Sequence, residues 1–254
     1  SSYAASIAQK VAAKHEMDVN QINITQINAG IELNKIKYIA NHINNDNLPV
    51  ELLIRNTTLE SGDPLGFMDD EFKPNINFPV IFSSISPTLV THIGNPEKFF
   101  FGGINLQHIS EIQFSRNILL STEFNARVYG DFENTISGPG SVMEHVRTDL
   151  VEYLKEDDIV ISRMQLDYVW SPRKDTYAKL SGGIYETMFA GYGIETLYKP
   201  FGKNYSLGFE LFHVKQRSFD QRFSFKDYDT VTGHLNFGYS LPLGIESNIS
   251  YGRY

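Results

Sequence analysis

Alternation of apolar and polar side chains at every second position is the feature that most constrains how this chain can fold. The segment YSLGFELFHV, residues 205–214, has apolar odd positions at its start and small or acidic even positions. The odd positions are Tyr205, Leu207, Phe209 and Leu211, and the even positions are Ser206, Gly208 and Glu210. Because side chains alternate across a β-strand, this pattern predicts a strand with two unlike faces. It recurs at 120–128, 164–170, 178–184 and 231–241, so the chain is predicted to be mainly β.

Composition excludes several classes of protein. The 254 residues are 41% hydrophobic, which is enough to bury a substantial core. The formal net charge is -8 and the Lys and Arg residues are scattered, which argues against a nucleic-acid partner, because binding phosphates needs clustered positive charge. The chain has no cysteine, which excludes disulfides and thiolate metal ligands. No segment approaches the roughly 18 consecutive apolar residues of a membrane-spanning helix.

The sequence divides into three regions. Residues 1–56 contain an alanine-rich helical pattern, two strands turning near Gly30 and a third candidate strand at 48–56, so we expect a small α/β lobe. Residues 57–80 combine Gly, Pro and acidic residues and predict a linker or long loop. From 81 to 254, alternating segments are separated by turn sequences such as NPEK, SRN, SPRKD and FGKN, which predicts about ten strands.

The polar face of these strands indicates which solvents they meet. It mixes Gly, Ser and Asn with isolated charges, whereas a soluble sandwich usually exposes Lys, Glu and Thr. A transmembrane barrel turns its apolar face to lipid and small polar residues to a lumen, and strands of about 9–11 residues suffice to cross. Aromatic residues gather near the segment ends, as in the girdles of such barrels: Tyr168, Trp170, Tyr177, Tyr198, Phe201, Tyr205 and Tyr239. The pattern favours an antiparallel transmembrane β-barrel and leaves open a soluble β-sandwich.

Several longer strings between residues 84 and 254 carry a family resemblance. ETMFAGYGIE, LYKPFG, VKQRSFDQRF and YDTVTGH, preceded by SPTLVTHIGNPEKFFFGGI, resemble the most recognisable segments of the YjbH family of outer-membrane exopolysaccharide and capsule proteins. The resemblance implies a Gram-negative outer-membrane β-barrel, with lobe 1–56 in the periplasm, that assists secretion or surface presentation of the polymer. It implies outer-membrane lipid, exopolysaccharide and other polysaccharide-export proteins as partners. The family offers no catalytic residues to carry over, and no cofactor is expected.

The predicted strands must also close into a barrel if they lie in a membrane. A membrane sheet cannot leave an open edge in hydrocarbon, because each unpaired backbone group is costly there. The segment SNISYGRY indicates a strand that ends before its turn. We therefore expect an incomplete portion of a longer barrel, or a barrel closed by segments outside this sequence.

The densest cluster of charge is VKQRSFDQRFSFKDYD, residues 214–229. Charged and aromatic side chains are interleaved there, a pattern in which Arg forks can bind the carboxylates of an acidic polysaccharide while rings stack on sugars. The predicted binding residues of this cluster are Arg217, Asp220, Arg222 and Phe223. The alternative is a structural hairpin whose charges pair with one another at the water-facing end of two strands.

A second group of polar residues falls on the predicted lumen face. Lys179, Glu195 and Glu210 are predicted to bind the polysaccharide, and Asp167 and Tyr185 share their face. These side chains form either a polar path for a sugar chain or a salt-bridge network that plugs the interior.

No catalytic or metal-binding residues are predicted. Glu186 and Glu195 are the carboxylates that would suit a glycosidase, in which one acid protonates the leaving oxygen and the other is nucleophile or base, but no spacing fixes their separation. The histidines lack HExxH or HxH spacing, and SGPGSV lacks the Lys and Ser or Thr of a P-loop. The predicted function is non-enzymatic, with a soluble or surface all-β carbohydrate-active enzyme, glycosidase-like or lyase-like, as the alternative.

Overall fold

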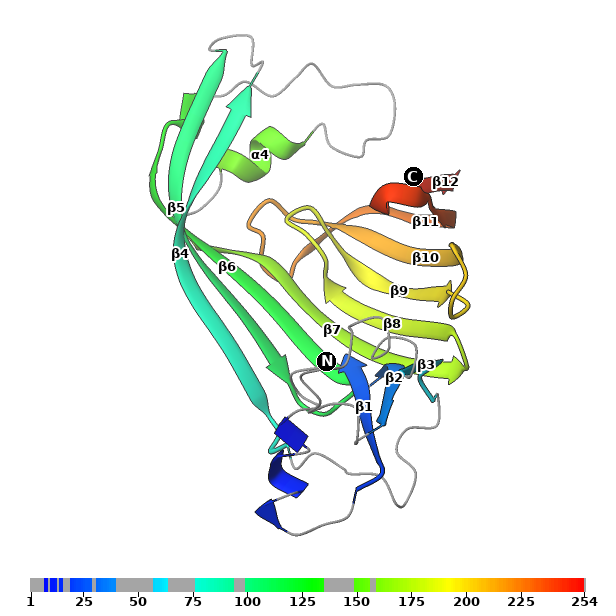
Figure 1. Cartoon of the computed structure of the whole chain (residues 1–254). Helices are drawn as coiled ribbons and strands as arrows, with labels where there is room; N and C mark the ends of the chain where they lie inside the picture. The colour runs from blue at the N-terminus through cyan, green and yellow to red at the C-terminus, as the bar shows by residue number, and fades with distance from the viewer. Residues whose placement is uncertain are drawn as a thin grey trace.

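Two antiparallel sheets account for most of the protein, which is mainly β as predicted (Figure 1). The computed structural model describes residues 7–8, 10–12, 14–15, 19–28, 31–39, 57–63, 76–93, 99–134, 149–155 and 159–253. Helices are few and short among the described residues: helical positions between 7 and 14, α4 (Leu150–Lys155) and the 3-10 turns η1 (Phe132–Asn134) and η2 (Pro242–Gly244). None of the helices in the described part of the chain is long and apolar enough to span a membrane.

The described residues form nine strands of the larger sheet, compared with the prediction of about ten. They are β4 (Val80–Ile93), β5 (Phe100–Gln113), β6 (Ile118–Gly130), β7 (Ile159–Arg173), β8 (Thr176–Ile184), β9 (Phe189–Tyr198), β10 (Tyr205–Arg217), β11 (Phe225–Ser240) and β12 (Glu246–Arg253). Each strand pairs with the strands before and after it in the sequence. β4 and β12 are the edges, and within the described ranges no ladder joins them, so the sheet is open.

Turn sequences separate these strands where the composition predicts them. SRN lies between β5 and β6, SPRKD overlaps the turn between β7 and β8, and FGKN lies between β9 and β10. In the second of these turns Asp175 has a φ of 60°, a left-handed conformation that Asp tolerates better than most residues. NPEK lies outside the described residues.

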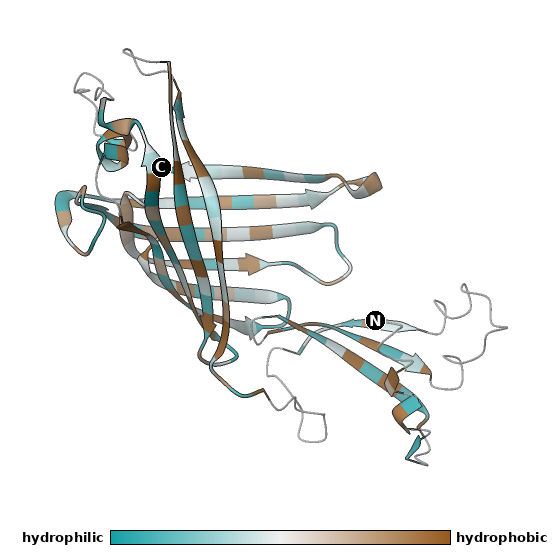
Figure 2. Cartoon of the chain, turned by 90° about the vertical axis from the view of Figure 1, so that its left-hand side faces the viewer, coloured by the Kyte–Doolittle hydropathy of each residue, from teal (hydrophilic) through white to brown (hydrophobic). Residues whose placement is uncertain are grey.

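The two faces of the larger sheet differ in polarity, and the apolar face is the exposed one. Hydropathy alternates along its strands in Figure 2. Leu89 is 78% exposed and Leu235 60% exposed, values expected of surface side chains rather than of a core. In β10 the odd positions from Tyr205 to Leu211 are exposed, whereas the even positions between them are half-buried on the opposite face. The alternation predicted for this segment is confirmed.

The main apolar cluster lies away from that exposed face, around α4. The sheet curves, and α4 lies on its concave side (Figure 1). Tyr153, Met188 and Phe189 are buried together, with Leu150, Val214, Phe219 and Tyr228 packed against them. A helix of six residues is marginal by itself in water, so this packing against the strands is what stabilises α4.

The smaller sheet contains β1 (Gln21–Asn28), β2 (Ile31–Ile39) and β3 (Thr58–Ser61). β1 and β2 form the predicted hairpin, and the described residues between 7 and 14 are helical, as predicted. Within the linker or loop predicted at 57–80, Thr58–Ser61 form a strand instead, because they pair with Asn34–Lys37 of β2. A strand of four residues is too short to show a clear alternation of polarity, and the Gly and Pro residues that follow it favour a loop prediction. The strand predicted at 48–56 lies outside the described residues.

Candidate functional site

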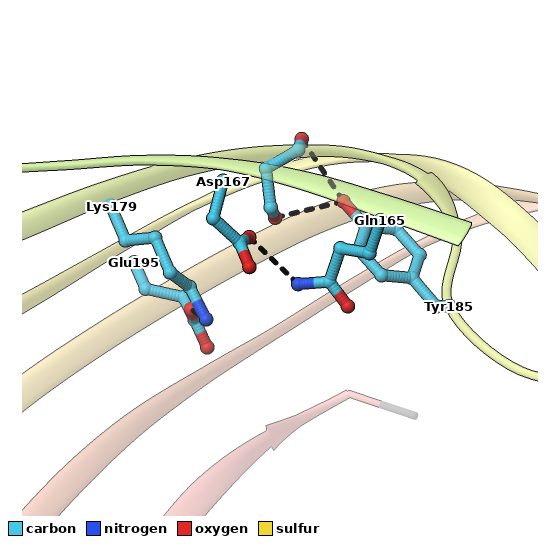
Figure 3. A network of polar contacts seen from close by, with 6 residues as sticks. Gln165, Asp167, Lys179, Tyr185 and Glu195 are labelled. Atoms are coloured by element: carbon cyan, nitrogen blue, oxygen red, sulfur yellow. Dashed lines mark hydrogen bonds and ion pairs between the residues drawn. The ribbon is translucent and has the colours of Figure 1, made fainter. Parts of the chain in front are cut away.

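One row of charged side chains crosses four strands on the concave face of the larger sheet. The register places Lys179 of β8 opposite Glu195 of β9, Glu195 opposite Glu210 of β10, and Glu210 opposite His234 of β11. Lys179 forms an ion pair with Glu195, and the two side chains lie together in Figure 3. The Nδ1 atom of His234 lies 2.7 Å from Oε1 of Glu210. The two acidic side chains are therefore neighbours, each with a basic residue on its other side.

Buried polar side chains extend this row toward β7. Gln165 donates a hydrogen bond from Nε2 to Asp167 at 2.7 Å, and both side chains are almost fully buried (Figure 3). Asp167 lies opposite Ser181, whose hydroxyl is 2.9 Å from that of Tyr185. These contacts fix the side chains in place and give the concave face an ordered polar lining.

A groove of about 430 Å³ runs along the charged row. Its lining includes Lys179, Glu195 and Glu210, together with small residues of the neighbouring strands: Ser206, Gly208, Asn236, Gly238 and Asn248. The glycines make room for neighbouring polar side chains: a Cβ on Gly238 would come within 2.5 Å of the Ser206 hydroxyl, and one on Gly208 within 3.3 Å of the Asn236 side chain. The small polar residues predicted for the inner face thus line an open groove.

An aromatic pocket lies farther along the same face. The rings of Tyr185 and Phe212 meet edge to face, with centroids 5.5 Å apart, and those of Phe189 and Tyr228 are 6.3 Å apart. All four residues line the pocket with Thr230 and Thr232. The Phe212 ring covers Gly193, where a Cβ would come within 2.1 Å of it. Flat apolar rings beside a polar groove are a suitable surface for a sugar ring, which has both apolar faces and hydroxyl edges.

Comparison with known proteins assigns the family. Residues 4–254 match the family described as "Exopolysaccharide biosynthesis protein YbjH". The chain belongs to the YjbH family. It is 27% identical over 222 residues to the "Uncharacterized lipoprotein YjbH" of Escherichia coli (strain K12), an alignment that covers 85% of this chain. The chain spans 31% of the length of that curated relative, and no solved structure matches.

Arg217 was predicted to bind the polymer, but in this YjbH-family chain it lies inside the protein. Its side chain is fully buried, and its guanidinium donates to backbone carbonyls. The accepting residues are Ile161 (2.9 Å), Glu186 (3.0 Å), Thr187 (3.0 Å), Arg222 (3.1 Å) and Gln221. A guanidinium has a fixed set of N–H donors, and these contacts use most of them. The structure therefore differs from the surface position predicted for Arg217: the side chain joins segments of the chain, and its guanidinium is buried among backbone carbonyls.

The other predicted binding residues of the cluster at 214–229 lie in the turn between β10 and β11, at 218–224. Asp220 accepts hydrogen bonds from the backbone N–H of Arg222 at 3.2 Å and from the Ser224 hydroxyl at 2.9 Å, which closes the turn. Arg222 and Phe223 are exposed. Lys226 lies 3.6 Å from Asp149. These contacts favour the structural hairpin that was the alternative for this cluster.

The two predicted binding groups lie apart. Arg217 is seven residues beyond Glu210 on β10, a distance of roughly 23 Å along an extended strand. Lys179, Glu195 and Glu210 lie together in the charged row, whereas Asp220, Arg222 and Phe223 lie at the end of the sheet. The charged row is therefore the better candidate site.

Residues that the sequence did not single out hold α4 to the concave side. Tyr153 donates its hydroxyl to the Arg217 carbonyl, and Gln221 donates to the Tyr153 carbonyl at 2.8 Å. Gln216 donates to Asp149 at 2.9 Å, and Arg127 donates to the Leu154 carbonyl. Burial raises the pKa of the Tyr153 hydroxyl, which keeps it protonated as a donor. The contacting residues are 60 or more positions apart in most of these bonds, so no local pattern indicates them.

The glycosidase pair is not brought together. The backbone N–H of Glu186 bonds to the Phe189 carbonyl, and Glu195 lies six residues farther along β9, which corresponds to roughly 20 Å. Glycosidase carboxylates are about 5–9.5 Å apart. Among the described residues, no group of His, Asp and Glu side chains is arranged to hold a metal ion.

Proposed function

We propose that the larger sheet is part of the wall of an outer-membrane β-barrel, and that this YjbH-family chain assists export or surface presentation of an exopolysaccharide or capsule polymer without catalysing a reaction. The observation that carries the proposal is the polarity of the sheet, which has an exposed apolar face and a polar concave face. Soluble monomers rarely expose apolar patches beyond a few hundred Å². Lipid on the apolar side and water on the concave side account for both faces.

Strand length and aromatic placement support this proposal. β10 has 13 residues and β11 has 16, more than the roughly 9–11 that cross a bilayer when tilted. Tyr205 lies opposite Tyr239 near one end of these strands, and both side chains are exposed on the apolar face. The rings of Tyr168 and Trp170 stack 5.3 Å apart near the same end of β7. Amphipathic rings at such a level suit a membrane interface.

The two edge strands of the sheet, β4 and β12, need hydrogen-bonding partners if the proposal holds. In lipid, the free backbone groups of β4 and β12 would need hydrogen-bond partners. Under the proposal these come from another portion of the same barrel or from another polysaccharide-export protein. The E. coli relative is named a lipoprotein, which supports a place in the cell envelope, and the smaller sheet would then lie in the periplasm.

A cysteine scan of β10 tests the proposed membrane wall. The chain has no cysteine, so single replacements from 205 to 212 each give one labelling site. In native membranes, we expect odd positions 205–211 to react with a lipid-soluble thiol reagent and even positions 206–210 with a water-soluble one. If the odd positions resist both reagents, they are covered by protein, and the membrane wall is wrong.

A second experiment separates the export role from the enzymatic alternative. The folded chain should require detergent for extraction and should change its gel mobility on heating, as membrane barrels do. Purified chain should release no reducing sugar from exopolysaccharide. Extraction without detergent together with release of reducing sugar would instead support a soluble carbohydrate-active enzyme.

A further inference from the structure

The basic side chains of the concave face are already engaged by the protein. Lys179 pairs with Glu195, and Lys226 lies near Asp149 and over the Phe219 ring, 3.1 Å from its centroid. Arg127 donates to the carbonyls of Leu154 and Lys155 and lies over Phe132. Each of these cations has an anionic, carbonyl or aromatic partner within the described residues. A polyanion would have to displace such a partner to bind.

Hydrogen-bond acceptors, by contrast, are in surplus on the same face. Carboxylates lie there at Glu123, Asp167, Glu195 and Glu210, and an ionised carboxylate offers about four lone-pair sites. Buried amide oxygens outside the groove lining add to the acceptors of this face. Oδ1 of Asn125 and Oε1 of Gln165 are buried and accept no hydrogen bond within the described residues. Their residues are 8% and 6% exposed. Buried acceptors of this kind are costly until a donor reaches them.

The groove itself is also lined by hydrogen-bond acceptors. Glu195 and Glu210 are directly opposite each other, so their negative charges lie side by side on the groove floor. A ligand that brought further carboxylate, sulfate or phosphate groups would add negative charge and acceptors where both are already in excess. A ligand rich in hydroxyl groups would instead donate hydrogen bonds to the carboxylates of Glu195 and Glu210, which line the groove. The aromatic pocket begins at Phe212, two residues along β10 from Glu210, and offers ring faces to the same ligand.

We infer that the concave face is built for a non-anionic, hydroxyl-rich sugar chain and discriminates against acidic polysaccharide. This inference rests on the proposed polymer-export function and names the class of polymer. It also differs from the acidic polysaccharide predicted as the ligand of the cluster at 214–229. The Arg217 guanidinium of that cluster donates to backbone carbonyls instead.

Two oligosaccharides of equal length and different charge test the inference. The full chain in detergent micelles is titrated by calorimetry, at low salt, with maltoheptaose and with a heptamer of galacturonic acid. We expect maltoheptaose to bind and the uronate to bind about tenfold more weakly, because of repulsion by the paired carboxylates. In the double variant Glu195→Gln, Glu210→Gln, which keeps the side-chain shapes, the difference between the two ligands should shrink. The matched control Asp229→Asn, outside the groove lining, should leave it unchanged.

The outcomes separate this inference from the proposed function. Uronate binding that equals or exceeds maltoheptaose binding overturns the ligand class but leaves polymer binding intact. No binding of either sugar overturns the ligand class and the polymer role together, while the cysteine scan of β10 still decides the membrane wall independently.

Discussion

Two regions of this chain combine charges with aromatic rings, and they differ in what the charges contact. In the rim turn, defined as Arg217 and the turn residues 218–224 that follow it, Arg217 is fully buried and donates to backbone carbonyls of distant segments. In the charged row of Lys179, Glu195, Glu210 and His234, side chains contact one another along an open groove. Charged side chains therefore form a structural joint in one place and the lining of an open groove in the other. The difference is the group that each cation contacts, which is a set of backbone carbonyls for Arg217 and a carboxylate for Lys179.

The largest effect is expected from removing the Arg217 guanidinium. Arg217→Met leaves several buried carbonyls without a donor at once, so we expect the free energy of unfolding to fall by about 3–5 kcal/mol. Urea titration in detergent micelles measures the loss. Arg222→Met, at an exposed position of the same turn, is the control and should change stability by less than about 0.5 kcal/mol. Equal effects of the two variants would remove the distinction between the regions.

A smaller loss is expected where the aromatic pocket meets the backbone of β9. The Phe212 ring occupies the space of a Cβ on Gly193, so Gly193→Ala must displace it and should destabilise the chain by about 1–3 kcal/mol. At Gly182, on β8, a Cβ would have only ordinary contacts, the shortest at 3.7 Å. Gly182→Ala should therefore be close to neutral in the same titration. A neutral Gly193→Ala would show that Phe212 does not rest on the backbone.

The joint between α4 and the rim turn should be sensitive to one hydroxyl. Tyr153→Phe removes the donor to the Arg217 carbonyl and keeps the ring, so we expect a loss of about 1–2 kcal/mol in the free energy of unfolding. Tyr251→Phe is the matched control, because Tyr251 is 81% exposed on β12. If both substitutions have the same effect, the hydroxyl of Tyr153 contributes nothing to holding α4.

The smallest effect on stability is expected in the charged row. The side chains of Lys179 and Glu195 are 33% and 31% exposed, and ion pairs of this kind typically contribute about 0–1 kcal/mol. A double-mutant cycle of Lys179→Ala and Glu195→Gln measures their coupling. A coupling energy above about 2 kcal/mol would indicate a salt-bridge network that plugs the interior, and the contrast with the rim turn would disappear.

Local pattern was sufficient to predict part of this structure. The period of two placed Lys179, Glu195 and Glu210 on one face, and the structure confirms that placement. It also placed the apolar side chains of β10 on the opposite face. These predictions hold because side-chain direction in a strand depends only on the neighbouring backbone.

Other features depend on contacts that local pattern does not encode. The charged row requires the register between β8, β9, β10 and β11, which turn lengths and bulges determine. His234 alternates with the apolar positions of its strand, but nothing in the local sequence indicates that it contacts Glu210. The burial of Arg217 depends on carbonyls of Ile161 and Thr187, more than 25 residues away. Charged residues that are close together in the sequence do not reveal which distant carbonyls will accept their hydrogen bonds.

The order of the strands in the larger sheet has a consequence for how such proteins vary in size. Each strand is hydrogen-bonded to the strands that precede and follow it in the chain, without any crossover. A hairpin inserted at a turn leaves every other ladder intact, so evolution can widen or narrow the sheet in steps of two strands without redesigning the remaining pairs. It also means that, during folding, each new strand finds its partner within a few tens of residues, and loop closure stays inexpensive from the first hairpin to the last.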